Sequence, residues 1–180
     1  MKEDRLSPWY MFEGICRKQP NVRAIWTRER SWTYKEMYDH AIQLAQWMYE
    51  EGVRPGDLVA FYLVNSAEFL MLVFATFAIG AAPSLINYNL EGKALLHCIS
   101  VSNSKLLIAD PDKGCQQRIE GSRDKIEAGG TKIVTLSEEF KRQRRAMPVV
   151  PPDEALRRGV KPGFPYLLVC QVQRACTDGD

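Results

Sequence analysis

The stretch LVAFYLVNSAEFLMLVFATFAIGAAPSLI, residues 58–86, decides the fold class of this chain. Its first part, Leu58–Val64, is an almost uninterrupted apolar run, which is typical of a strand buried on both faces of a parallel sheet. Asn65–Glu68 carries cap-forming residues, so an apolar helix is expected from there to about Ile79. Ala82–Ile86 looks extended again. The stretch therefore predicts a strand–helix–strand unit with parallel strands.

The apolar part of this stretch is too short and too interrupted for a membrane span. A span needs about 20 predominantly apolar residues, whereas the run from Phe69 to Ile86 is shorter and contains Gly80 and Pro83. We expect a helix there, the most buried of the fold, followed by a strand. The first five residues are mixed in charge and lead into no apolar core, so no secretory signal is indicated. Membrane association by another route stays open.

On the N-terminal side, the sequence predicts a hairpin followed by a long amphipathic helix. Ala24–Thr33 has β-favouring residues around a polar tip, with two tryptophans available to pack. Thr33 and Glu36 have the spacing of a capping box, in which each side chain satisfies an amide of the first helical turn. Apolar residues recur at helical spacing as far as Tyr49. Gly52 should supply the left-handed residue that ends the helix, and a turn at Arg54–Asp57 follows.

On the C-terminal side, strands and helices continue to alternate. Glu91–Val101 is expected to be a helix and Lys105–Ala109 a strand. Gln116–Ala128 is expected to be a polar helix and Lys132–Leu136 a strand. The segment after Ser137 is expected to be a helix capped by that residue. Such alternation is typical of βαβ units with right-handed crossovers. The predicted fold class is α/β, a mostly parallel sheet flanked by helices.

The chain divides into five parts by sequence texture. Residues 1–23 are a lead-in to the α/β region, which spans residues 24–140. Residues 141–163 form a basic, proline-containing surface linker. Residues 164–169 form a buried strand, and residues 170–180 are a tail without helical or strand period.

Composition excludes several functional classes. The hydrophobic share of 46% is that of a globular protein, and 24 Lys and Arg against 22 Asp and Glu give no strong field that would attract nucleic acid. The cysteines are odd in number and lack CxxC pairs, which fits a reducing compartment rather than a disulfide framework or zinc site. Two histidines leave little for a metal cage. The five cysteines are Cys16, Cys98, Cys115, Cys170 and Cys176.

Residue patterns alone assign no catalytic, cofactor-binding or metal residue. Neither GxGxxG nor GxxxxGK[ST] occurs, and the first three cysteines suit packing or surface positions better than nucleophilic ones. His97 is expected to be a hydrogen-bonded structural residue rather than a base. Asn87–Asn89 follows a strand at the edge where open α/β sheets bind ligands, although turn formation explains it better. The basic run 141–145 suits a solvated helix end better than a lipid contact.

Several segments together resemble the N-terminal part of the adenylate-forming acyl-CoA synthetases. Within that superfamily they are most similar to the fatty acid transport protein and very-long-chain acyl-CoA synthetase branch, particularly its fungal members. The resemblance covers roughly residues 7–169, and the run Ile86–Leu90 followed by Leu96–Cys98 points to the branch. The matching segments are Ala24–Trp26, Ser31–Glu36, Gly52–Ala60, Asn65–Phe69, Ile79–Leu90 and Ala94–Cys98.

The resemblance implies a reaction, its cofactors and a setting. In the family a fatty carboxylate attacks the α-phosphate of ATP, and coenzyme A captures the acyl-adenylate with Mg²⁺ assisting. Fatty acid, ATP and coenzyme A are the implied partners, without nucleic acid. The implied localisation is intracellular and membrane-associated, at the endoplasmic reticulum, peroxisome, lipid droplet or plasma membrane, although no anchor is visible in this chain.

The chain departs from the family where the phosphate loop should begin. The family places a Tyr-Thr-Ser-Gly-Thr-Thr-Gly-x-Pro-Lys motif directly after a strand like 164–169, but residues 170–180 are unrelated to it. The codons of Cys170–Cys176 permit Ser-Gly-Thr-Thr-Gly-Leu in a shifted frame, so we hypothesise a frameshift, intron or gene-model error, which transcript sequencing tests. We expect a truncated homologue that binds no cofactor and is inactive as this chain. The alternative is a non-enzymatic acyl-binding or protein-interaction module.

Overall fold

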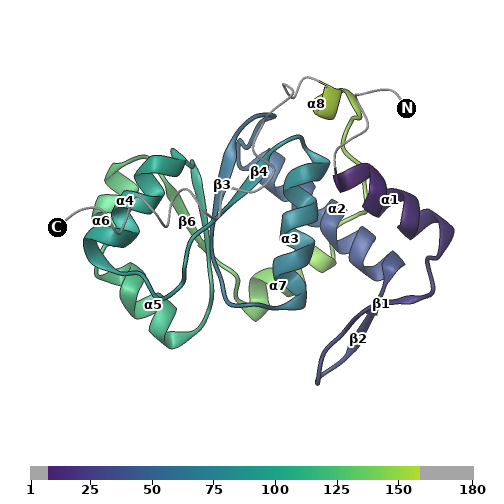
Figure 1. Cartoon of the computed structure of the whole chain (residues 1–180), viewed down its shortest axis with the longest axis horizontal. Helices are drawn as coiled ribbons and strands as arrows, with labels where there is room; N and C mark the ends of the chain where they lie inside the picture. Colours follow the sequence, from purple (N-terminus) through teal and green to yellow (C-terminus); the bar gives the residue numbers. More distant parts are fainter. Residues whose placement is uncertain (1–7, 159–180) are drawn as a thin grey trace.

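A computed structural model describes residues 8–158 of the 180-residue chain. The predicted strand 164–169 and tail 170–180 lie outside the described residues. The described part is an α/β fold in which a parallel sheet carries helices on both faces, as predicted (Figure 1). A small antiparallel hairpin projects from it near the N-terminal helix.

Four parallel strands form the sheet, in the order β4-β3-β5-β6. Each lies where the sequence predicts a strand, but is shorter by one to two residues: β3 Leu58–Tyr62, β4 Ala82–Leu85, β5 Leu106–Ala109 and β6 Lys132–Thr135. Residues of β3 and β5 are almost wholly buried, because these central strands are covered on both faces.

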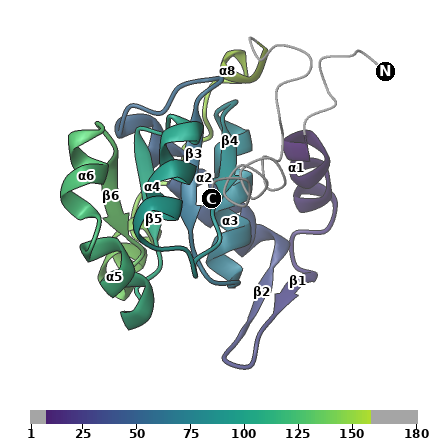
Figure 2. The same cartoon turned by 60° about the vertical axis from the view of Figure 1, so that its left-hand side comes forward.

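Alternation along the strands divides the core into two halves. Val59 and Phe61 of β3 face one half, whereas Ala60 and Tyr62 face the other. The first half is built against α1 to α3 and the second against α4 to α6, on opposite sides of the sheet (Figures 1 and 2). The helices are α1 Pro8–Lys18, α2 Tyr34–Glu50, α3 Ala67–Ala78, α4 Gly92–Ser102, α5 Lys113–Glu120 and α6 Arg123–Ala128.

Local signals in the sequence explain where α2 and α3 begin and where α2 ends. The Thr33 hydroxyl accepts the Glu36 amide, and the Glu36 carboxylate accepts the Thr33 amide, which completes the predicted capping box. Ser66 caps α3 by accepting the Phe69 amide at 3.1 Å. Gly52, at φ 91°, takes the left-handed conformation expected after α2.

Only one of the two hairpin tryptophans packs. The hairpin consists of β1 Arg23–Trp26 and β2 Ser31–Thr33, as predicted. Trp32 is buried in the core, but Trp26 is 79% exposed because neighbouring residues of a strand point to opposite faces. The expectation that both would be available for packing was therefore wrong for Trp26.

Two other segments differ from expectation. The lead-in contains α1, which buries Trp9 and Phe12 in the core, although no helix was predicted there. The single helix predicted for 116–128 is two helices, since Gly121 and Ser122 are poor helix formers and interrupt it.

The linker expected from residue 141 begins inside a helix. Helix α7, Glu138–Arg145, carries the basic run, and its Phe140 ring meets Trp47 edge-on at 4.7 Å. Beyond it lies the short helix α8, Ala155–Arg158. Both are attached to the body of the fold, since Gln43 donates to two carbonyls at the end of α7 and Arg157 donates to the Ala78 carbonyl.

Candidate functional site

The topology places a switch point between β3 and β5. The chain leaves β3 along α3 on one face of the sheet and leaves β5 along α5 on the other. In open α/β sheets, ligands bind beyond the carboxyl ends of strands where the connections diverge in this way. The loops after β3 and β5 are therefore the candidate functional site.

The Asp110 carboxylate holds the two sides of this switch point together. It is 7% exposed, and its two oxygens accept the Val64 amide at 3.1 Å and the Asp112 amide at 2.9 Å. Asp112 in turn caps α5 by accepting the amides of Gly114 and Cys115. Both carboxylates are thus used to order the backbone, and sequence reasoning had assigned neither a role.

A second polar group fixes the loop after β4. The Tyr62 hydroxyl donates to the Leu90 carbonyl at 2.7 Å, and Arg118 Nε donates to the Tyr62 hydroxyl at 2.9 Å and to the Tyr88 carbonyl at 3.0 Å. Burial raises the pKa of Tyr62, so its hydroxyl stays neutral. Asn87 accepts the Asn89 amide at 3.0 Å, which is the turn role favoured over ligand contact for this segment.

The predicted role of His97 needs correction. His97 is exposed on α4, not a buried structural histidine, because it points away from the side on which Leu95 and Cys98 are buried. The buried histidine is His40, whose Nδ1 lies 3.4 Å from Gln43 Oε1 and whose ring stacks on Trp32. Burial lowers the pKa of His40 to about 4, so it is neutral near pH 7.

The three cysteines within residues 8–158 have a packing role, one of the two alternatives expected for them. Cys16, Cys98 and Cys115 are all buried. Burial raises the pKa of Cys16 to about 11, and burial also raises that of Cys115. A nucleophilic cysteine needs a depressed pKa, so neither thiol is activated.

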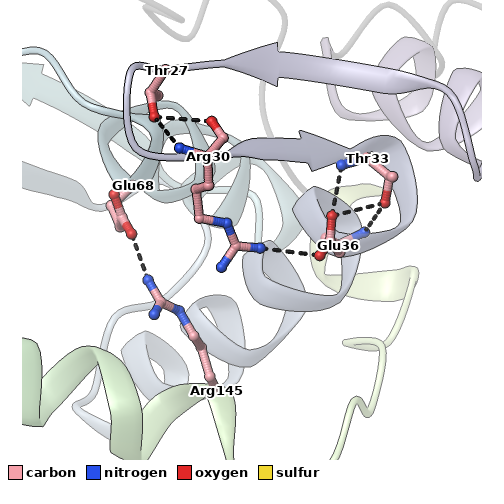
Figure 3. Close-up of polar contacts among 6 residues, drawn as sticks. All are labelled: Thr27, Arg30, Thr33, Glu36, Glu68 and Arg145. Carbon is pink, nitrogen blue, oxygen red and sulfur yellow. Dashed lines mark hydrogen bonds and ion pairs between the residues drawn. The ribbon is translucent and has the colours of Figure 1, made fainter.

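A charged cluster lies beside the first turn of α3 (Figure 3). Arg145 of α7 pairs with Glu68 at 2.5 Å, and Arg30 of the hairpin pairs with Glu36 at 3.0 Å. The guanidinium carbons of both arginines lie over the Trp32 ring, at 5.1 and 3.6 Å from its centroid. Each arginine is already neutralised by a carboxylate, so the cluster joins α7 and the hairpin to α2 and α3.

Three of the four basic side chains in the α7 run are likewise compensated, whereas the guanidinium of Arg144 lies over the Phe140 ring. Lys141 pairs with Glu138 at 2.6 Å, Arg142 pairs with Glu139, and Arg145 pairs with Glu68. This arrangement matches the solvated helix end favoured for residues 141–145.

The capping box gives this cluster a pH dependence. The Thr33 amide bonded to the Glu36 carboxylate lowers the pKa of Glu36. A depressed folded-state pKa contributes stability above the unfolded value, and that stability is lost as pH falls through the folded value. We therefore expect Glu36→Gln to lower the free energy of unfolding at pH 7 by about 0.5–1 kcal/mol, and the difference to shrink below about pH 4.

Urea denaturation at pH 7 and pH 3.5 measures this difference. Glu29→Gln is the matched control, since Glu29 is an exposed hairpin carboxylate outside the capping box, and it should change stability little at either pH. An equal loss for Glu36→Gln at both pH values would contradict the assignment.

Metal ligands, helix starts and a cavity of residues 8–158 bear on whether this part of the chain could hold a nucleotide. Within residues 8–158, no three His, Cys, Asp or Glu side chains gather as metal ligands would. At the switch point, the N-termini of α3 and α5 are already capped, by the Ser66 hydroxyl and the Asp112 carboxylate respectively. The negative charge of the Asp112 carboxylate would repel a phosphate. A cavity of about 110 Å³ lined by Cys16, Arg17, Lys35 and Tyr38 is smaller than the roughly 300–1,000 Å³ of typical ligand sites.

Residues 8–158 also contain no helix that is long and apolar enough to cross a membrane. The Phe69–Ile86 stretch forms α3 and β4 instead, as predicted.

Comparison with known proteins gives a family and a fold. A family model described as "AMP-binding enzyme" matches residues 12–162. Isopenicillin N epimerase component 1 of Hapsidospora chrysogena is 34% identical over 140 residues, 76% of this chain and 23% of that protein. The very long-chain fatty acid transport protein of Cochliobolus heterostrophus is 36% identical over 132 residues, 73% of this chain and 20% of that protein.

A solved structure shares the fold. A fatty acyl CoA synthetase of Mycobacterium tuberculosis superposes with a TM-score of 0.73 at 22% identity, covering 80% of this chain and 29% of the other. The chain thus spans about a fifth to a quarter of the length of the two curated relatives.

Proposed function

Because the chain belongs to the AMP-binding enzyme family, we propose that it supplies part of the N-terminal α/β domain of an ATP-dependent long- or very-long-chain fatty acid CoA ligase. The observation that carries the choice of substrate is the 36% identity over 132 residues to a very long-chain fatty acid transport protein. The fold of a fatty acyl CoA synthetase, shared over 80% of the chain, supports the assignment to the α/β domain.

In this proposal the 180-residue chain does not perform the ligation by itself. Adenylation requires groups that stabilise the charge of a triphosphate, such as backbone amides, hydroxyls and a lysine around the phosphates. The family's Thr-Ser-Gly-Thr-Thr-Gly phosphate loop is absent from the sequence. At the switch point, the carboxylates of Asp110 and Asp112 order backbone amides, and a carboxylate in that position repels a phosphate. ATP, Mg²⁺ and coenzyme A therefore belong to the longer family members.

The role assigned to the described residues is structural support of an active site. Asp110 fixes the loops after β3 and β5, and the Tyr62–Arg118 pair fixes the loop after β4. A rigid carboxyl edge of this kind is what an acyl-adenylate site built on the sheet would need. We propose a membrane-associated, intracellular setting, because fatty acyl substrates partition into lipid.

A chimera tests the proposal. Residues 8–158 replace the superposing segment of the Mycobacterium tuberculosis fatty acyl CoA synthetase, and ligation of coenzyme A is measured with a long-chain fatty acid and with isopenicillin N. We expect the chimera to retain fatty acyl ligation. The unmodified synthetase is the positive control, and the synthetase without the segment is the negative one. A folded chimera that is inactive with fatty acids, or that prefers isopenicillin N, would contradict the proposal.

A further inference from the structure

The two most exposed large apolar side chains of the described residues belong to α1 and the hairpin. Trp26 on the hairpin and Met11 on α1 are 79% and 71% exposed, and Ile15 and Val22 between them in sequence are also exposed. Helix α1 and the hairpin that follows it both lie at the end of the molecule away from α4 to α6 (Figures 1 and 2). We call this the hairpin–α1 surface, defined by Met11, Ile15, Lys18, Val22, Arg23, Trp26 and Arg28.

The geometry of the hairpin forces Trp26 outward. Ile25 lies opposite Trp32 in the strand pairing, and both pack against the core, so Trp26 and its partner Ser31 face the other way. The tip is held in shape by Thr27, whose hydroxyl accepts the Arg30 amide and donates to the Arg30 carbonyl (Figure 3). The same hydroxyl also accepts the Glu29 amide. Trp26 is therefore presented on an ordered turn.

Arg30 adds rigidity at the base of the turn. Its guanidinium covers the inner face of the hairpin at Trp32 and is paired with Glu36 of α2. The outward position of Trp26 is thus fixed by contacts on the opposite side of the hairpin.

Positive charge is concentrated on the same segment. Residues 8–33 contain five basic residues (Lys and Arg) and two acidic residues (Asp and Glu). The whole chain contains 24 basic and 22 acidic residues, so the residues outside 8–33 carry one net negative charge. Within the described part of the chain, Lys18, Arg23 and Arg28 form no ion pair. The surface therefore combines exposed apolar side chains with uncompensated cations.

We propose that the hairpin–α1 surface docks on an anionic lipid bilayer. Tryptophan and aliphatic side chains enter the interfacial zone of a bilayer, and nearby arginine and lysine side chains meet the negative headgroups. A second copy of the chain would instead bring the same positive charges face to face. The proposal extends the membrane setting proposed above, but its test measures lipid binding and not ligation, so the two can fail separately.

Tryptophan fluorescence gives a direct reading of this docking. All four tryptophans are described, and Trp9, Trp32 and Trp47 are each at most 5% exposed, so Trp26 is the one that lipid can reach. We expect the emission of the purified chain to shift to shorter wavelength when phosphatidylcholine vesicles containing phosphatidylserine are added. Vesicles of phosphatidylcholine alone should produce little shift at the same lipid concentration.

Variants locate the binding. In co-sedimentation with the phosphatidylserine vesicles, Trp26→Ala and Arg28→Glu should each weaken partitioning by about tenfold. The matched controls, Val101→Ala and Lys93→Glu, make an apolar truncation and the same charge change at exposed positions of α4, and should leave partitioning within about twofold. Circular dichroism confirms that each variant is folded.

Three results would overturn the proposal. The first is no vesicle binding, or equal binding to both lipid mixtures. The second is a loss for Lys93→Glu as large as for Arg28→Glu, which would indicate a non-specific charge effect. The third is a Trp26 emission shift that appears with protein concentration in the absence of lipid, which would identify a second copy as the occupant.

Discussion

Replacing Trp9 with alanine is expected to lower the free energy of unfolding by about 3–5 kcal/mol, the range found for large aromatic residues removed from a core. Trp9 is 1% exposed, and its ring lies 5.7 Å from both Phe12 and Tyr38. Phe12 stacks on Phe74 of α3 at 3.9 Å, so α1 joins α2 and α3 through a continuous aromatic contact. The cavity left by the indole would separate these helices.

Urea denaturation followed by circular dichroism measures the loss. Met11→Ala is the control on the same helix, since Met11 is 71% exposed, and it should change stability by less than about 0.5 kcal/mol. If Trp9→Ala were as mild as Met11→Ala, α1 would not belong to the cooperative unit, and the lead-in would be a separate segment.

Replacing Asp110 with alanine should cost about 3 kcal/mol, the upper part of the range for losing hydrogen bonds to a buried charged group. The substitution leaves the Val64 and Asp112 amides without their acceptor at the carboxyl ends of β3 and β5. These loops would then lose their fixed spacing, so the effect falls on the edge where the family's ligands are expected.

Two further variants separate this role from a general effect of charge. Asp110→Asn keeps one acceptor oxygen and should lose roughly half as much stability as Asp110→Ala. Asp112→Ala removes only the cap of α5 and should cost about 1 kcal/mol. Hydrogen exchange at the Val64 amide reads the bond directly, and unchanged protection of that amide in Asp110→Ala would contradict its assignment.

Local signals in the sequence predicted the regular elements well. The run at Leu58 identifies a buried strand because it is apolar on both faces, and Thr33 with Glu36 marks the start of α2 through their own hydrogen bonds. The fold class follows from the strand–helix alternation. Helix α1 was missed although its sequence carries local signals: Pro8 stands at its first position, and Trp9, Phe12 and Cys16 recur at helical spacing.

The site was less predictable, because its residues act through long-range partners. Asp110 reaches Val64, 46 positions away, and Arg118 reaches Tyr62, 56 positions away. The apolar neighbours of His97 suggested burial, yet the helix turns it outward. Residues three or four positions apart share one face of a helix, so Leu95 and Cys98 lie on the same face of α4. His97 lies two positions from Leu95 and therefore on another side of the helix.

The central proposal is that these 180 residues are part of the α/β domain of a fatty acid CoA ligase and do not adenylate a fatty acid by themselves. The purified chain is incubated with ATP, Mg²⁺, coenzyme A and a long-chain fatty acid, and pyrophosphate is measured beside an intact long-chain fatty acid CoA ligase. The account predicts no fatty acid-dependent pyrophosphate above the blank without protein. Pyrophosphate release that requires the fatty acid and rises in proportion to the concentration of the chain would contradict it.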